Sequence, residues 1–189
     1  MAVRKEVSSL DPQRWIDAAI EILVGGNVDA IRVEVLAKTL GVTKGSFYWH
    51  FRDRSDLLAR LLAFWRDGRI ADITRHAASP PGREREQALR LIELYSANRS
   101  RKGIAIELAI RDWARKDEMA AKAVEEVDVV RLDLAGSLLA ASGFPPAEAR
   151  ARSLLLYAYV FGQSLMFYDH FDDDLPALKR WVADHIVNR

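Results

Sequence analysis

Residues 42–51 read Val-Thr-Lys-Gly-Ser-Phe-Tyr-Trp-His-Phe, and this stretch decides how the N-terminal part of the chain folds. Thr43 is a favourable N-cap, because its hydroxyl can accept a hydrogen bond from the backbone N–H groups that open a helix. Phe47 and Phe51 lie four residues apart and therefore share one face of that helix. The stretch predicts a short helix with an apolar anchoring face.

The other faces of this helix carry a cation, hydroxyls and aromatic side chains that suit contact with DNA. These residues are Lys44, Ser46, Tyr48, Trp49 and His50. Such groups can donate hydrogen bonds to phosphate oxygens and base edges. Gly45 weakens a helix by about 1 kcal/mol relative to alanine, which fits a backbone that approaches another surface closely. In the alternative interpretation the helix only packs in a small bundle. For Trp49 two positions stay open: it flanks a sugar-phosphate, or it covers the core of its own domain.

Two further helices precede this stretch. The second is expected over 33–40, where apolar residues recur at helical spacing and Gly41 stands where glycine often ends a helix. The first is expected from Asp11 and Pro12, an N-cap followed by a proline at the first helical position, to the glycine pair at 25–26. Because the connection between the second and third helices is so short, the segment has the organisation of a helix-turn-helix.

Residues 14–62 resemble the DNA-binding domain of the TetR/AcrR family of transcriptional repressors. The matching positions are Ala19, Leu23, Gly26, Val33, Leu36, Ala37, the run from Gly41 to Tyr48, His50, Phe51, Leu57 and Leu58. Arg54 stands where the family usually has a lysine, and Arg32 lies at a site where threonines are frequent; both are expected to meet phosphates. The residue types and the resemblance together predict a DNA-binding surface of Arg32, Thr43, Lys44, Gly45, Ser46, Tyr48, Trp49, His50 and Arg54.

Composition agrees with a DNA-binding protein of modest total charge. The chain has 189 residues, of which 50% are apolar, and a formal net charge of +1, so it can form one large or two small domains. Positive charge is concentrated between residues 38 and 60, where Lys38, Lys44, Arg52, Arg54 and Arg60 outnumber Asp53 and Asp56. The sequence has no cysteine, no apolar signal segment and no run long enough to cross a bilayer, so we expect a cytoplasmic protein.

The rest of the chain is also typical of helices, and Asp53 and Asp56 form a plausible N-cap and N3 pair for the fourth helix. We expect helices from 54 to the Ser-Pro-Pro-Gly run at 79–82, and over about 83–98, 104–116, 118–142, 146–168 and 175–188. The predicted fold is therefore all-α with about nine helices. We expect a three-helix helix-turn-helix DNA-binding domain over 1–53 and a helical regulatory and dimerisation domain over 54–189.

The segment 146–168 is apolar on almost every side. A helix of this kind has to be buried all round, and in a small chain this favours a second subunit. The resemblance implies the same, because these repressors pair their last two helices into a four-helix bundle across a twofold axis. We expect the interface at Ala158, Gly162, Leu165 and Trp181, where the two small residues allow close helix approach. The alternative is a central helix in a monomeric core.

A dimer would place two DNA-reading helices about 34–36 Å apart, so its operator should be an inverted repeat. The resemblance implies that a small molecule, apolar or amphipathic, binds the C-terminal domain and releases the protein from DNA. Large aromatic side chains on different helices are candidates for its pocket: Trp65, Tyr95, Trp113, Tyr157 and Phe161. These side chains also fit an ordinary core.

Catalysis finds little support in the sequence. The four histidines (His50, His76, His170 and His185) are scattered, and none has the spacing of a metal-ligand pair. The acidic run at 169–174 could hold a cation, but it also fits a polar loop whose Asp174 caps the last helix. We expect no catalytic residue, no metal site, no cofactor and no membrane partner. Two alternatives stay open: a helix-turn-helix activator or a regulator without inducer, and a helical enzyme or interaction protein.

Overall fold

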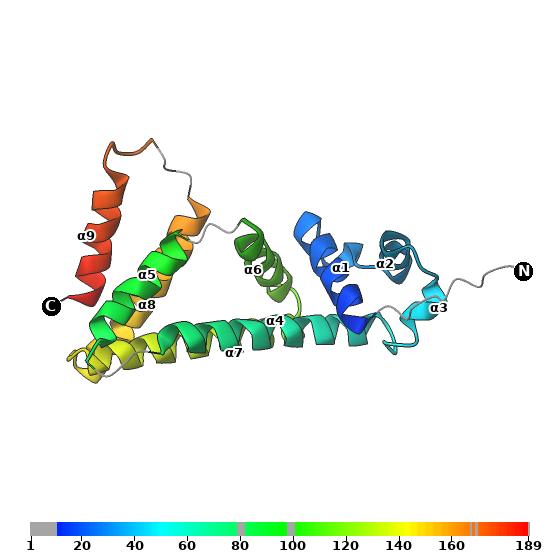
Figure 1. Cartoon of the computed structure of the whole chain (residues 1–189), viewed down its shortest axis with the longest axis horizontal. Coiled ribbons are helices and arrows are strands. Elements are labelled where there is room, and N and C mark those ends of the chain that lie inside the picture. Colours follow the sequence, from blue (N-terminus) through cyan, green and yellow to red (C-terminus); the bar gives the residue numbers. More distant parts are fainter. Residues whose placement is uncertain (1–10, 79–81, 98–100, 167, 169, 189) are drawn as a thin grey trace, which may run out of the picture. The chain divides into compact units, whose positions relative to one another are not determined.

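The computed structural model of the chain describes residues 11–78, 82–97, 101–166, 168 and 170–188. In this part of the chain it contains nine α-helices and one 3-10 helix, and no strand, in the order shown in Figure 1. The prediction of an all-α fold that begins with a helix-turn-helix is confirmed. None of the described helices is both long enough and apolar enough to span a lipid bilayer.

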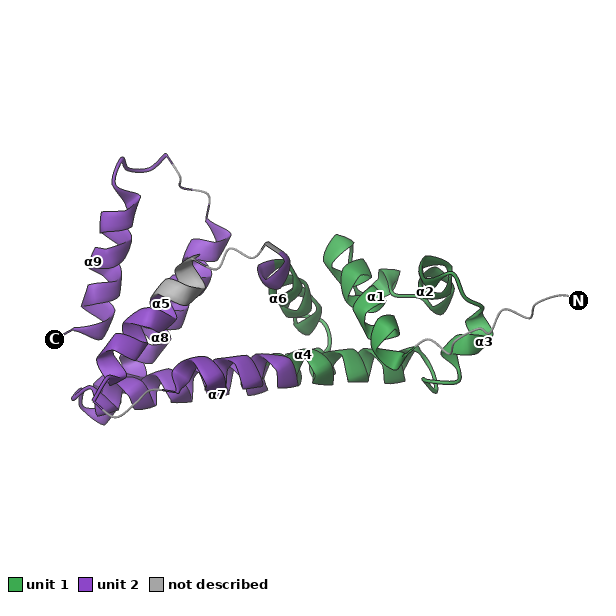
Figure 2. Cartoon of the chain, in the orientation of Figure 1, with its two compact units in different colours: residues 1–66, 105–124 green, residues 67–104, 125–189 purple. Residues whose placement is uncertain are grey.

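Contacts between residues divide the chain into two compact units, which Figure 2 distinguishes by colour. The first unit comprises the residues up to Arg66 together with 105–124, and the second comprises 67–104 and 125–189. The first unit therefore includes the beginning of the fourth helix as well as the helix-turn-helix. The boundary expected between residues 53 and 54 stays a prediction.

The first unit contains the helices α1 (Pro12–Gly25), η1 (Val28–Ala30), α2 (Val33–Leu40) and α3 (Lys44–Phe47). Its predicted helix ends are confirmed for α1 and α2. The Asp11 carboxylate accepts a hydrogen bond from the Gln13 N–H at 3.0 Å, and so caps α1. After α2, Gly41 has a φ of 68° and its N–H donates to the last carbonyls of the helix, a left-handed conformation that favours glycine.

The third helix differs from the prediction in length and in its cap. It ends at Phe47, and the chain continues in a turn in which the N–H groups of His50 and Phe51 both donate to the Phe47 carbonyl at 3.0 Å. The prediction that the Thr43 hydroxyl caps the helix is wrong. Instead, the Thr43 carbonyl closes the first turn, because it accepts from the Ser46 hydroxyl at 2.7 Å and from the Ser46 N–H at 3.2 Å.

Aromatic side chains hold this short helix against the rest of the unit. Phe47 is fully buried, with its ring edge-on to Trp15 at a centroid distance of 5.4 Å and stacked on Phe51 at 5.2 Å. Leu36 and Leu57 are also completely buried in this unit. Burying a phenylalanine side chain stabilises a fold by about 1.5–3 kcal/mol, so Phe47 and Phe51 form the predicted anchoring face.

The remaining helices are α4 (Arg54–Ala77), α5 (Glu84–Ala97), α6 (Arg101–Ala114), α7 (Glu118–Ala141), α8 (Pro146–Leu165) and α9 (Leu175–Val187). Two predicted boundaries are wrong by three residues. Helix α6 begins at Arg101, since Gly103 is accommodated inside the helix rather than before it. Helix α8 ends at Leu165, where Met166 becomes extended and the Ser164 hydroxyl donates to the Phe161 carbonyl at 2.7 Å.

Arg152 of α8 fixes the C-terminal end of α9 in the second unit. Its Nη1 donates to the carbonyls of His185 and Ile186, each at 2.8 Å, and to that of Asn188 at 3.0 Å. The Arg152 guanidinium also pairs with Glu148 at 2.8 Å and lies 4.2 Å from the centre of the Phe144 ring. The last carbonyls of a helix have no partner within the helix, so Arg152 replaces the missing donors.

We predict that Arg152→Met lowers the free energy of unfolding by about 2 kcal/mol, because charge-assisted hydrogen bonds are lost and the carbonyls at the end of α9 lose their donor. Urea denaturation measures the change. Arg150→Met is the matched control on the same helix, since the Arg150 side chain is exposed. Equal effects of the two substitutions would contradict a capping role for Arg152.

Candidate nucleic-acid interface

The predicted DNA-binding residues around α3 form an exposed surface beside a buried anchor. Tyr48 and Trp49 are 60% and 76% exposed, whereas Phe47 between them and the core is fully buried. Arg32, Thr43, Lys44 and Gly45 are also exposed, and Ser46 is half-buried. Trp49 does not cover the core of its own domain, so that alternative for its side chain is wrong.

Lys44 is held across the turn between α2 and α3. Its Nζ lies 3.4 Å from Oε1 of Glu34, and both side chains are exposed. The pKa of Glu34 is lowered by its backbone hydrogen bond at the start of α2 and by Lys44. An exposed ion pair is weak, so the Lys44 ammonium can exchange the carboxylate for another anion.

Besides the Ser46 hydroxyl, which donates to the Thr43 carbonyl, two predicted contact residues have atoms that are engaged or covered inside the unit. Arg54, the first residue of α4, donates from Nε to the Ile31 carbonyl at 2.6 Å and from Nη2 to the Val28 carbonyl at 2.5 Å. The Nε2 atom of His50 is buried and makes no hydrogen bond to the described residues. His50 can therefore meet a ligand directly only through its other ring nitrogen unless the ring moves.

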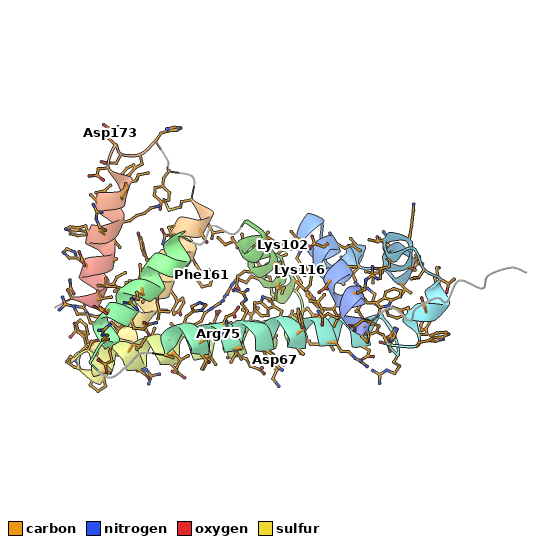
Figure 3. All side chains as sticks on the ribbon, in the orientation of Figure 1. Asp67, Arg75, Lys102, Lys116, Phe161 and Asp173 are labelled. Carbon is orange, nitrogen blue, oxygen red and sulfur yellow. The ribbon has the colours of Figure 1, made fainter. Side chains whose placement is uncertain are left out.

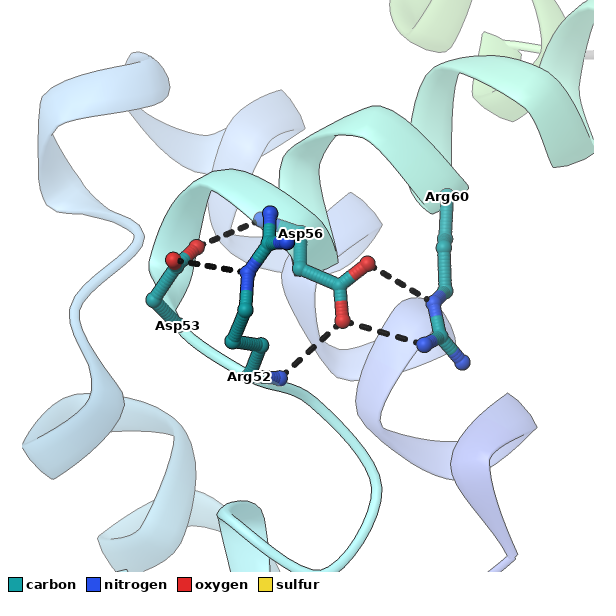
Figure 4. A network of polar contacts seen from close by, with 4 residues as sticks. All are labelled: Arg52, Asp53, Asp56 and Arg60. Atoms are coloured by element: carbon teal, nitrogen blue, oxygen red, sulfur yellow. Dashed lines mark hydrogen bonds and ion pairs between the residues drawn. The ribbon is translucent and has the colours of Figure 1, made fainter.

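A polar network connects the end of the α3 turn to the start of α4 (Figure 4). The Asp53 carboxylate accepts from the Asp56 N–H at 2.8 Å and from Arg52 Nε at 3.3 Å. Asp56 in turn accepts from the Arg52 N–H at 3.0 Å and from two nitrogens of Arg60, both at 3.0 Å. The sequence predicts Asp53 and Asp56 as the cap of α4, and this is confirmed. It does not reveal Arg52 and Arg60 as members of the network, although the four-residue spacing of Asp56 and Arg60 is a signal for such a pair.

The network lowers the pKa values of both carboxyl groups. For Asp56 the main cause is the hydrogen bond from the Arg52 backbone, followed by that from the Arg60 side chain. For Asp53 the main cause is the hydrogen bond from the Asp56 backbone. Both groups are therefore held in the ionised form at neutral pH, and their ionised form fixes the loop that follows α3.

The residues predicted to line a ligand pocket are divided between the two units. Trp65 and Trp113 are buried in the first unit. In the second unit Tyr157 is buried and Phe161, which Figure 3 labels, is half-buried, with 6.4 Å between their ring centroids. The side chain of Tyr95 lies outside the described part of the chain.

The predicted dimer residues lie on apolar surface of α8 and α9. Leu165 and Trp181 are 56% and 61% exposed, and Ala158 is exposed as well. Sequence reasoning missed Leu154 and Leu155, which are about 60% exposed on α8, although they precede Ala158 by the spacing of one helical face. A groove of about 440 Å³ adjoins this surface; its lining includes Gly162, Met166, Leu178 and Val182.

In the predicted acidic run, residues 170–174 form a turn that leads into α9, and Figure 3 labels Asp173 in this turn; Asp169 lies outside the described residues. The Asp174 carboxylate accepts a hydrogen bond from the Ala177 N–H at 3.0 Å, so the predicted cap of the last helix is confirmed. Asp172 accepts from the Asp174 N–H at 2.8 Å. Among the described residues, no three histidine or acidic side chains are grouped as metal ligands.

The fold and this surface define an all-α protein whose first unit carries a helix-turn-helix. Residues 16–61 match the family described as bacterial regulatory proteins, tetR family. Over 51 residues the chain is 41% identical to the HTH-type transcriptional regulator SrpR of Pseudomonas putida, which covers 27% of this chain and 24% of SrpR. Over 55 residues it is 38% identical to the class A tetracycline repressor of Escherichia coli, which covers 29% of this chain and 26% of the repressor.

Solved structures match almost the whole chain. A transcriptional regulator from Rhodococcus sp. Rha1 superposes with a TM-score of 0.72 at 19% identity, over 94% of each chain. FadR from Bacillus subtilis, in complex with stearoyl-CoA, gives a TM-score of 0.64 at 18% identity, over 94% of this chain and 98% of FadR. The sequence matches span about a quarter of the length of SrpR and of the tetracycline repressor. The structural matches cover 94% of this chain, so the shared fold extends beyond the helix-turn-helix. Residues 16–61 of this chain are thus similar to the tetR family in sequence, and the chain shares the fold of these solved structures.

We predict that Asp56→Asn lowers the unfolding temperature at pH 7, because the amide is a weaker acceptor for the Arg52 N–H and for Arg60. The folded pKa of Asp56 lies below the unfolded value of about 3.9. The stabilisation is therefore present above that value and is lost as the pH falls through the folded pKa. Thermal unfolding from pH 7 to about pH 2 should show the difference between wild type and variant shrinking.

The control is Asp133→Asn, which changes an exposed carboxyl group on α7. It should leave the unfolding temperature nearly unchanged across the same range. A constant difference between wild type and Asp56→Asn at every pH would contradict the role given to the ionised carboxylate.

Proposed function

We propose that the protein is a dimeric, ligand-responsive transcriptional repressor that binds an inverted-repeat operator through residues 43–50. The observation that carries this proposal is the exposed Lys44, Tyr48 and Trp49 next to the buried Phe47. An arrangement of this kind presents donors from a fixed helix to a groove of DNA. The names of SrpR as a regulator and of the class A tetracycline repressor support the same function.

In this proposal the helix-turn-helix grips one half of the operator. Lys44 releases Glu34 and pairs with a phosphate, while the hydroxyls of Tyr48 and Ser46 reach phosphates or base edges. Arg32 and Thr43 contact the sugar-phosphate backbone beside the groove, where Trp49 packs against a sugar. Gly45 lets the protein backbone come close to the DNA. The fold itself does not require glycine here, because a Cβ at this position would meet only the Thr43 Oγ1, at 3.6 Å.

Dimerisation supplies a second helix-turn-helix, which binds the other half of the operator. The exposed apolar residues of α8 and α9, among them Leu154, Leu155, Leu165 and Trp181, are costly to leave in water. A second copy would cover them through the same surface, as twofold dimers do. The adjoining groove shares Gly162 with the predicted interface and gives room for apolar side chains of the partner.

A small molecule bound in the C-terminal domain would control the operator affinity. It can do so only by binding the form that is released from DNA more tightly than the form that fits DNA. Of the aromatic residues predicted to line its pocket, Tyr157 and Phe161 lie together in the second unit and would supply apolar walls. The stearoyl-CoA complex of FadR supports an apolar or amphipathic ligand for this fold.

Selection of bound sequences from random duplex DNA is the experiment that tests the proposal. Enrichment of an inverted repeat supports both DNA recognition and twofold symmetry. Recovery of no preferred sequence would favour the helical enzyme or interaction protein. An activator, or a regulator without inducer, would still select an operator. Transcription from that operator with and without the protein distinguishes an activator from a repressor.

We predict that Lys44→Ala and Tyr48→Phe each weaken operator binding about tenfold, the size expected for one charge-assisted hydrogen bond. For Lys44→Ala the slope of log K against log salt should also become less steep by about 0.9, because one phosphate contact is lost. Titrations at several salt concentrations measure both effects. Lys122→Ala, an exposed charge on α7, is the control, and unchanged affinity in both Lys44→Ala and Tyr48→Phe would show that α3 and the turn after it do not contact the operator.

We predict that Gly162→Trp disrupts the dimer and leaves each subunit folded. Nothing lies within 4 Å of a Cβ added at Gly162, so one subunit tolerates a side chain there. Sedimentation velocity measures the oligomeric state, and circular dichroism checks the helix content. Gly68→Trp is the matched control, since this helical glycine is equally open. A Gly162→Trp protein that still sediments as a dimer would show that the interface lies elsewhere.

A further inference from the structure

The guanidinium of Arg54 is directed at backbone carbonyls on another part of the first unit. Its Nε donates to Ile31 and its Nη2 donates to Val28, residues that precede it by 23 and 26 positions in the chain. Both bonds are short, at 2.6 and 2.5 Å, and both are partly shielded from solvent. Hydrogen bonds from a charged donor are stronger than those between neutral groups.

The two carbonyls belong to the segment that leads into α2. The Val28 carbonyl also accepts from the Ile31 N–H at 3.2 Å, which closes η1. Ile31 itself is fully buried, and α2 begins two residues later at Val33. Arg54 therefore joins the first turn of α4 to the start of α2, and its withdrawal would leave the Ile31 carbonyl without a donor in a buried region.

Arginine suits this connection better than lysine does. The planar guanidinium presents donors in a fixed fork that spans two acceptors, whereas a lysine ammonium is a single point of charge. With Nε and Nη2 engaged, a phosphate would have to be met by the remaining N–H groups or would have to displace a carbonyl. Arg32 and Lys44, by contrast, are exposed, and Lys44 holds only a weak surface partner.

We infer that Arg54 is a positioning residue of the helix-turn-helix, which fixes the start of α2 on α4, and not a contact to the DNA backbone. Two residues further along α4, the Asp56 carboxylate accepts a hydrogen bond at 3.0 Å from the Arg52 N–H, which lies after α3. The start of α4 is thus tied to both helices of the helix-turn-helix: to the turn after α3 through Asp56, and to the start of α2 through Arg54. This inference rests on the proposed function, because it assigns the arginine a role within the DNA-reading unit.

The test compares Arg54→Lys and Arg54→Ala with Arg32→Ala in the full-length protein. Urea denaturation gives the stability of each variant. Affinity is then measured, at a temperature where every variant is folded, for the duplex recovered by selection and for a scrambled duplex of equal length, at several salt concentrations. Arg32→Ala is the comparison because Arg32 is an exposed, predicted phosphate contact.

We expect Arg54→Lys and Arg54→Ala to lower the urea midpoint by similar amounts, since neither side chain holds two donors in the fixed fork that spans the two carbonyls. Both should reduce the ratio of specific to non-specific affinity about tenfold. This is the size of effect expected when misplacement of α2 and α3 loses one base contact. Their salt slopes should equal that of wild type. Arg32→Ala should instead leave the ratio unchanged and make the slope less steep by about 0.9.

Two results would overturn the inference. A salt slope that is less steep by about 0.9 in Arg54→Ala, together with wild-type stability, affinity and slope in Arg54→Lys, would show that Arg54 contacts a phosphate. Reduced stability with an unchanged affinity ratio would show a structural role without effect on reading. If the proposed function itself is wrong, the wild-type protein will bind the scrambled and the selected duplex equally well. That result is distinct from either of the two above.

Discussion

Helix α3 has only four residues, from Lys44 to Phe47, and a helix of this length has no stability of its own in water. Its position depends on the burial of the Phe47 ring between Trp15 and Phe51. Because this ring is locked in the core, the residues on either side of it are held outward in one orientation. The exposed tyrosine and tryptophan that follow are thus presented by packing rather than by the helix itself.

Polar contacts then fix the loop and the helix that come after this anchor. Arg60 connects the two kinds of interaction, because its guanidinium pairs with Asp56 and lies 5.2 Å from the centre of the Phe51 ring. Arg54 supplies a second connection, to the carbonyls before α2. Each of these contacts is modest when taken alone. Together they leave the short reading segment few ways to move independently of α4, which is what a rigid reader of DNA requires.

The second unit shows the same division between a fixed part and an available surface. Arg152 and the core around Leu139, Leu156 and Val187 hold α8 and α9 together. On the outside of the pair, leucine and tryptophan side chains are left in solvent. A helix that is apolar on both sides therefore has one side used within the chain and one side free for a second copy, which is the arrangement that the proposed dimer needs.

The sequence by itself determined the helices, most of their ends and the apolar anchor, since caps, glycines and periodicity act within about four residues along the chain. Asp11, Gly41, Asp53 and Asp174 were all identifiable in this way. Only the tertiary structure showed the length of α3 and the unused hydroxyl of Thr43. It also decided the partners of Arg54, because these are groups brought together from more than twenty positions away. A local sequence pattern does not indicate which carbonyl, distant in the sequence, will lack a hydrogen-bond donor. Such a carbonyl loses its water partners only when the chain has packed.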